Sequence, residues 1–117
     1  MKPVTFDLIR KSSTRDDRVI QGARTVWSVD LPAEWGDLTG YAGRAMLRDD
    51  FADYASASFP ISVTLTGTEG RTLDFVFDDF DGELNIDGGR WDCEVFNGTV
   101  VIRTVMGAWQ NMREATR

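Results

Sequence analysis

Hydrophobic and polar residues alternate along most of the chain, and this period of two predicts half-buried β-strands. The alternation is clearest in Thr25–Leu31, Ile61–Thr66 and Leu73–Asp78. A strand over Val4–Ile9 is expected at the front of the chain, before a polar loop. In Trp91–Phe96, the residues Trp91, Cys93 and Val95 are expected to face the core. These segments together predict a protein built mainly from strands.

Two short polar segments predict hairpins between these strands. Gly67-Thr68-Glu69-Gly70 separates the strands over Ile61–Thr66 and Leu73–Asp78, so those two strands are expected to pair. Asn97-Gly98 separates Trp91–Phe96 from a strand over Thr99–Met106. Asn-Gly supplies the positive φ angles that a tight hairpin turn requires.

Two segments allow more than one interpretation. Ala45–Ala55 places Leu47, Phe51 and Tyr54 at helical spacing, but a strand that ends near Arg48, followed by a loop through Asp49-Asp50, is favoured because Asp-rich stretches disfavour strand interiors. Gly107 is expected to interrupt the last strand. Ala108–Arg117 then forms either a final strand or a short helix.

The spacing of the turn signals predicts the architecture. About seven short strands, with turns every ~8–12 residues, are typical of a β-sandwich or a small barrel. The chain has 117 residues, of which 42% are hydrophobic and 27% charged, as in an ordinary globular protein. We therefore expect one domain that spans residues 1–117.

The charge and the residue types that are scarce limit the classes of function. The net charge is −6 and the basic residues are not clustered, which argues against nucleic acid and anionic membranes as partners. The chain has no histidine and one cysteine, so the commonest general base and an internal disulfide are both ruled out. The N-terminus does not match a signal peptide, and we expect synthesis in the cytoplasm.

The segment Glu83–Glu94, ELNIDGGRWDCE, has nearly the oxygen spacing of an EF-hand calcium loop. The pattern fits poorly, because the first position is Glu rather than Asp and Glu94 falls in an alternating strand. Asp-Gly pairs in the acidic segment 78–89 are natural turn formers. The segment is therefore interpreted as a turn that leads into a strand, with no metal site expected. A looser calcium site remains an alternative, built from the acids Asp78, Asp79, Asp81 and Asp87.

Catalytic chemistry has weak support in the sequence. Cys93 is expected to be a buried, inert thiol, because it faces the core between two acids and lacks an activating histidine. Carboxylate pairs for a hydrolase could be drawn from Asp49, Asp50 and Asp53, or from residues 78–81. Neighbouring acids on turns are usually solvated charge, so we expect neither catalytic residues nor a cofactor.

Among the four tryptophans, Trp27 and Trp91 fall on core-facing strand positions and are interpreted as packing residues. Trp35 and Trp109 lie near the ends of elements. Exposed aromatic residues often anchor protein contacts. Trp35, Trp109 and Met112 are therefore the candidate protein-contact residues.

Two stretches resemble a known group of proteins. Asp37–Arg48, DLTGYAGRAMLR, resembles the DLTGYTARMQVR segment common in small β-rich tail and baseplate proteins of bacteriophages and prophages. Members of that group end with a G-x-Y-x-Y-D-L-E-V strand, a glycine turn, a strand leading to L-x-G, and E-V-T-R. The counterparts here are Gly89–Val95, Asn97-Gly98, Val105–Gly107 and Glu114–Arg117. Trp91 replaces the usual Tyr, and Trp109–Met112 replaces a plainer β-branched strand, which leaves the C-terminal conformation open.

The resemblance implies an all-β protein, an immunoglobulin-like antiparallel β-sandwich of about seven to eight short strands. It implies a non-enzymatic structural protein of the virion tail, either a baseplate or tail-tip subunit or an adaptor that docks receptor-binding fibres. Its partners would be other tail and baseplate proteins, and it would form a symmetric homo-oligomer in the assembled particle. The alternatives are a capsid decoration or head–tail connector protein, or a calcium- or carbohydrate-binding β-sandwich module.

Overall fold

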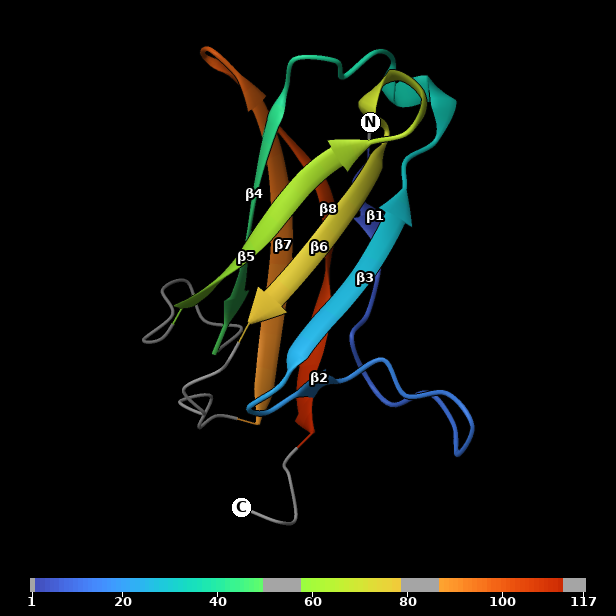
Figure 1. Ribbon diagram of the computed structural model, residues 1–117, viewed down its shortest axis with the longest axis vertical. Coiled ribbons are helices and arrows are strands. Elements are labelled where there is room, and N and C mark those ends of the chain that lie inside the picture. Colours follow the sequence, from blue (N-terminus) through green and yellow to red (C-terminus); the bar gives the residue numbers. More distant parts are fainter. Residues whose placement is uncertain (1, 50–57, 79–86, 113–117) are drawn as a thin grey trace.

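The computed structural model describes residues 2–49, 58–78 and 87–112 (Figure 1). Two 3-10 turns, η1 (Ala33–Trp35) and η2 (Thr68–Gly70), accompany the strands. The described residues include no helix with the length and hydrophobicity needed to span a membrane. The strands are β1 (Val4–Thr5), β2 (Val19–Ile20), β3 (Arg24–Asp30), β4 (Ala42–Arg48), β5 (Ser58–Thr66), β6 (Thr72–Asp78), β7 (Gly88–Asn97) and β8 (Val100–Met112).

The strands form two layers that share β5. The pairing order is β1-β8-β7-β4-β5-β6-β3, and β2 also pairs with β8. The first half of β5 pairs with β4 as far as Ile61, and the second half pairs with β6 from Ser62 onward. Figure 1 shows β5, β6 and β3 in front of β4, β7 and β8. The orders β3-β6-β5 and β4-β7-β8 correspond to the B-E-D and C-F-G orders of the immunoglobulin fold, which confirms an immunoglobulin-like β-sandwich.

The N-terminal segment departs from a purely antiparallel arrangement. β1 and β2 are each two residues long, and both pair with β8 in parallel. A parallel bridge between Leu8 and Trp109 lies between these two pairings. The expected strand over Val4–Ile9 is thus replaced by a short strand and an isolated bridge. This segment follows one edge of β8 and therefore covers part of that edge.

Both expected hairpins are present. β5 and β6 pair as antiparallel strands around η2. β7 and β8 also pair, but the strands close at Asn97 and Val100, so the two turn residues are Gly98 and Thr99 rather than Asn97 and Gly98. Gly98 has φ 61°, the conformation that glycine adopts most easily at the first central position of such a turn.

The last strand differs most from expectation. β8 does not stop at Gly107 but continues to Met112, so a strand rather than a helix follows Ala108. Gly107 is required by close approach, since a Cβ at this position would lie 2.1 Å from the Phe6 carbonyl oxygen. The favoured strand before Asp49 is confirmed, because β4 ends at Arg48. Residues 50–57 and 113–117 lie outside the described residues.

The alternating residues of both sheets form one core. Trp91, Cys93 and Val95 are buried as expected, and so are Leu73, Phe75 and Phe77. An aromatic cluster forms part of this core. Trp27 stacks on Phe75 with ring centroids 5.4 Å apart, and both rings make T-shaped contacts with Trp91. Trp91 is fixed further by its Nε1, which donates a hydrogen bond of 2.7 Å to the Phe6 carbonyl.

Candidate functional site

The structure changes the interpretation of two of the three candidate contact residues. Trp35 and Trp109 belong to the buried core, with 7% and 1% of their surfaces exposed. Trp109 also donates a hydrogen bond of 2.7 Å from Nε1 to the Arg48 carbonyl, which ties β8 to the end of β4. The expectation that these two side chains contact partners is therefore wrong. Met112 is 38% exposed at the end of β8 and remains a candidate.

The acidic residues do not converge among the described residues. No group of three or more Cys, Asp or Glu side chains in the described ranges is arranged to hold a metal ion. Glu94 lies in β7, as the strand interpretation predicted, and pairs with Arg44 at 3.2 Å. Asp78 and Asp87 are exposed, whereas Asp50, Asp53, Asp79, Asp81 and Glu83 lie outside the described residues.

Cys93 is fully buried, which confirms its interpretation as a structural thiol. Burial raises the pKa of this thiol to about 11, and the neighbouring Asp92 and Glu94 carboxylates add to the shift. The thiolate is the nucleophilic form of cysteine, so a raised pKa makes this group inert near neutral pH.

The exposed hydrophobic side chains define the candidate interaction surface instead. Large hydrophobic residues with exposed side chains lie on three strands: Ile20 on β2, Val26 on β3, and Val100, Val101 and Met112 on β8. Val26 is the most exposed, at 60%. β3 ends the pairing order, β2 pairs only with β8, and the hairpin end of β8 lies beyond the part that β1 and β2 cover, so these strands keep edges that can bind another chain.

β3 is the outermost strand of its sheet (Figure 1). Beside it lies an open groove of about 270 Å³, between the N-terminal segment and the first half of β3. The indole Nε1 of Trp27 is buried next to this groove and has no hydrogen-bond partner among the described residues. A buried donor without a hydrogen-bond partner lowers the stability of the folded state. The groove is lined by Phe6, Leu8, Asp16, Asp17, Arg18, Ile20, Arg24, Thr25, Val26 and Trp27.

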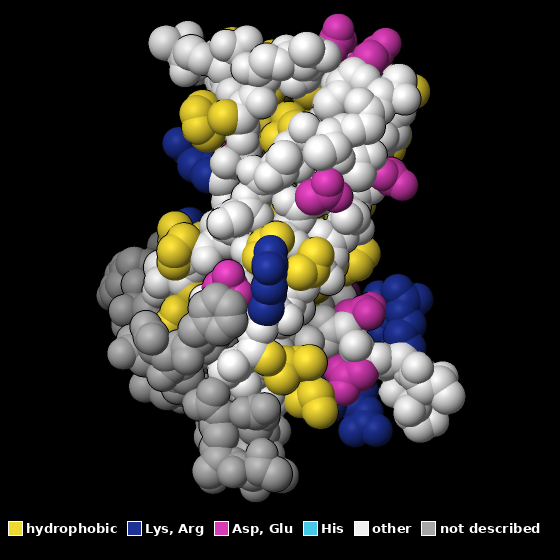
Figure 2. Space-filling model, viewed as in Figure 1, with side chains coloured by type: hydrophobic (Ala, Val, Ile, Leu, Met, Phe, Trp, Pro, Cys, Tyr) yellow, Lys and Arg dark blue, Asp and Glu magenta, His cyan; other side chains and the backbone are white. Residues whose placement is uncertain are grey.

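The outer face of the β3–β6–β5 sheet is polar at one end and hydrophobic at the other. Figure 2 shows acidic side chains over the upper part of this face, and hydrophobic side chains around a Lys or Arg in the lower part. In the polar part, the hydroxyls of Ser28 and Thr66 donate hydrogen bonds of 2.6 and 2.8 Å to the Asp74 carboxylate. These bonds hold the pKa of Asp74 below its usual value. Asp74 thus remains ionised near neutral pH.

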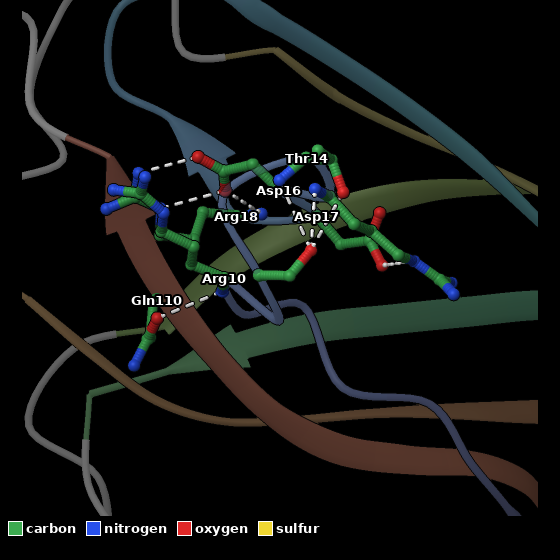
Figure 3. Close-up of polar contacts among 8 residues, drawn as sticks. Arg10, Thr14, Asp16, Asp17, Arg18 and Gln110 are labelled. Carbon is green, nitrogen blue, oxygen red and sulfur yellow. Dashed lines mark hydrogen bonds and ion pairs between the residues drawn. The ribbon is translucent and has the colours of Figure 1, made fainter.

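The polar loop between β1 and β2 borders the groove and is held by local contacts (Figure 3). Arg18 binds the Asp16 carboxylate through two nitrogens, at 2.8 and 2.6 Å. These hydrogen bonds lower the pKa of Asp16 to about 2. The loop is attached to β8 where the Arg10 N–H donates to the Gln110 side chain at 3.2 Å.

The sequence pattern did not identify the edge of β3 as a candidate surface. Val26 occupies the outward position of an alternating strand, where a hydrophobic residue stands out beside Arg24 and Ser28. This outward hydrophobic residue is the one feature of the sequence that could have indicated the surface. Its meaning depends on which strand lies at the edge, and the pattern within one strand does not reveal its neighbours.

Comparisons with known proteins add only a distant structural likeness. No protein-family model matches the chain, and no curated protein matches its sequence. Similar solved structures include the extracellular fragment, with its stalk region, of novel immune-type receptor 11 from Ictalurus punctatus. That fragment is 11% identical, with 100% of this chain and 89% of the fragment covered, and the TM-score is 0.37. We draw nothing about function from this likeness.

Proposed function

We propose that this chain is a non-enzymatic structural subunit of a bacteriophage tail. Within the tail, we place it in the baseplate or tail tip, or as an adaptor that docks receptor-binding fibres. The viral setting rests on the sequence resemblance of Asp37–Arg48 and the C-terminal strands. The assembly role is supported by one structural observation: the exposed large hydrophobic residues of the described chain lie on β3, on the short strand β2 and at the two ends of β8.

Edge strands suit assembly for a physical reason. An unpaired strand offers a row of backbone donors and acceptors, and a neighbouring chain can satisfy both at once. Exposed valines such as Val26 and Val101 add hydrophobic area to that contact. In a ring, one modest interface is repeated around the symmetry axis, and the repeated contacts act together.

The proposal is tested by counting copies in the particle. Quantitative mass spectrometry of purified virions from the phage or prophage that encodes the chain would give its copy number relative to the tail-tube protein. A low number, in multiples of three or six, is expected for a baseplate subunit or a fibre adaptor. Hundreds of copies would favour a capsid decoration protein, and absence from the particle would overturn the virion assignment.

A binding assay tests the contact surface separately. Immobilised chain is expected to retain tail proteins from a lysate of infected cells, and Val101→Ser is expected to weaken that retention. Thr99→Ser, in the exposed turn beside it, is the matched control and is expected to behave as wild type. Equal retention by both variants would remove Val101 from the contact surface.

The binding-module alternative makes a different prediction. A calcium site that is present only in the folded state would raise the melting temperature in millimolar calcium, and chelator would reverse the rise. The assembly proposal expects no change with either reagent. A reversible rise would favour the calcium-binding alternative.

A further inference from the structure

No backbone group of the described residues pairs with the outer edge of β3. The Leu31 N–H donates a hydrogen bond of 2.8 Å to the Arg71 carbonyl. This bond shows which residues of the strand direct their backbone N–H and C=O groups towards β6. In antiparallel pairs these positions alternate, so Val29, Trp27 and Thr25 direct their backbone groups towards β6. The residues between them therefore direct N–H and C=O away from the sheet: Arg24, Val26, Ser28 and Asp30.

This edge has little of the protection that edge strands usually carry. Natural edges are shortened, kinked by bulges, or interrupted by proline and lysine. β3 has seven residues, RTVWSVD, without proline or lysine and in unbroken register with β6. Its charged side chains stand at its two ends, and Val26 between them is the most exposed large hydrophobic residue described.

The order of side chains along β3 is complementary to itself. When two copies of the strand run antiparallel with Trp27 opposite Trp27, Arg24 lies opposite Asp30 twice, and Val26 lies opposite Ser28 twice. All of these residues have outward backbone groups, so each pair can form hydrogen bonds in this register. Opposite charges in directly facing positions stabilise antiparallel pairs. A register centred on Val26 would instead place Arg24 opposite Ser28 and leave Asp30 without a charged partner.

Arg24 is available for such a pair. Asp78 lies opposite Arg24 in the β3–β6 register, yet no ion pair joins the two side chains in the described structure. Asp30 accepts one hydrogen bond, from the Thr72 hydroxyl at 2.8 Å, and keeps its second carboxylate oxygen for another donor. In Figure 1 the N-terminal segment runs beside the outer side of β3, and an open groove of about 270 Å³ separates the two.

We propose that two copies of this chain associate through their β3 strands, antiparallel and centred on Trp27, to form one continuous six-stranded layer of β5-β6-β3 and its symmetry mate. The contact is isologous, so it closes as a two-fold dimer. The β3 dimer specifies one contact between copies of the chain within the proposed tail assembly. It rests on the proposed function only for the viral setting.

Charge exchange tests the register directly. Arg24→Asp places like charges opposite Asp30 in its own homodimer, and Asp30→Arg does the same opposite Arg24. Each single variant is therefore expected to dissociate at least about tenfold more readily than wild type in analytical ultracentrifugation. An equimolar mixture of the two is expected to form a heterodimer, since every facing pair then has opposite charge. Recovery in the mixture also shows that both variants are folded.

Proline substitution tests the role of the backbone. Val26→Pro removes an N–H that points away from β6, so the monomer keeps its internal strand pairing while the dimer loses a hydrogen bond. Val101→Pro is the matched control on the other edge, because Val100 closes the hairpin with Asn97 and Val101 therefore directs its N–H away from β7. We expect Val26→Pro to be monomeric and Val101→Pro to dimerise as wild type does. Far-UV circular dichroism at matched concentration verifies the fold of both.

Each outcome separates this inference from the proposed function. A wild-type chain that stays monomeric up to about 1 mM would overturn the β3 dimer. Dimers that tolerate Val26→Pro, or single charge variants that fail to recover on mixing, would also overturn it. In each of these cases a low copy number in virions would still support the tail assignment. Conversely, a β3 dimer formed by a protein absent from virions would keep this inference and refute the proposed function.

Discussion

The two ends of the strand order differ in how their edges are covered. The outer edge of β8 binds the N-terminal segment: the N–H groups of Phe6 and Leu8 donate to the carbonyls of Met106 and Ala108, at 2.9 and 2.8 Å. The backbone N–H of Gln110 donates a hydrogen bond of 2.8 Å to the Leu8 carbonyl. β3 has no comparable partner on its outer side among the described residues. The same chain thus protects one edge over most of its length and exposes the other.

This difference shows that short strands can protect an edge. β1 and β2 have two residues each, but with the bridge at Leu8 they satisfy the backbone of β8 between Val105 and Met112. Only the hairpin end of β8, which includes Val100 and Val101, extends beyond this cover. An interaction surface is therefore expected where the cover stops, at that hairpin end and along β3.

Removing the Trp109 side chain should have the largest effect on the covered edge. Trp109→Ala leaves a buried cavity and deprives the Arg48 carbonyl of its donor. We expect the free energy of unfolding to fall by about 3–5 kcal/mol, measured by urea denaturation. Met112→Ala, at the exposed end of the same strand, is the control and should cost about 1 kcal/mol or less. Equal losses in the two variants would contradict the core assignment of Trp109.

Adding a methyl group at Gly107 should separate the N-terminal segment from β8. The added Cβ would lie 2.1 Å from the Phe6 carbonyl oxygen, so the backbone must shift. Gly107→Ala is expected to cost about 1–3 kcal/mol. Hydrogen exchange should become faster at the amides of Phe6 and Leu8, while β3 and β6 keep their protection. Unchanged exchange at Phe6 would show that this cover does not depend on Gly107.

A smaller effect is expected at the irregular position of β8. Between Cys93 and Glu94 the register with β8 shifts by one residue, and the extra residue is Thr104. Thr104 is buried, and its hydroxyl donates to the Cys93 carbonyl at 3.3 Å. Thr104→Val keeps the shape and removes this bond, which should cost about 0.5–1.5 kcal/mol in thermal or urea unfolding. A more stable variant would show that the hydroxyl is not needed for the bulge.

The smallest effect concerns the polar loop next to the open edge. The Arg18 side chain lowers the pKa of Asp16 from 3.8 to about 2, so the Asp16–Arg18 pair favours the folded loop above pH 4. That contribution is lost as the pH falls from about 4 through about 2. NMR titration of the Asp16 carboxyl should give a midpoint near 2, and Arg18→Gln should raise it towards 3.8. An unchanged midpoint in Arg18→Gln would contradict the pairing of Asp16 with Arg18.

Several features could be predicted from the sequence because they depend on neighbouring residues. Alternation located β3, β5, β6 and β7, and the glycine-bearing turns placed both hairpins. Alternation also identified Trp91 and Cys93 as core residues. The number and spacing of these elements predicted an all-β protein, either a sandwich or a small barrel, and the sequence resemblance favoured the sandwich that the structure has. The viral tail assignment depends on sequence resemblance and remains a proposal.

The tertiary structure decided the features that depend on distant residues. In the sequence Trp109 lies near the end of an expected element, but the bulge at Thr104 changes which side chains of β8 point inward, and Trp109 is buried as a result. A glycine in a strand pattern suggests an interruption, and the real reason for Gly107 is its close contact with Phe6. The sequence pattern does not reveal this contact, because Phe6 lies far away in the sequence. The order of strands made β3 an open edge and gave Val26 its exposure. Local patterns determine which residues form strands, but the neighbours of each strand are set by packing across the whole chain.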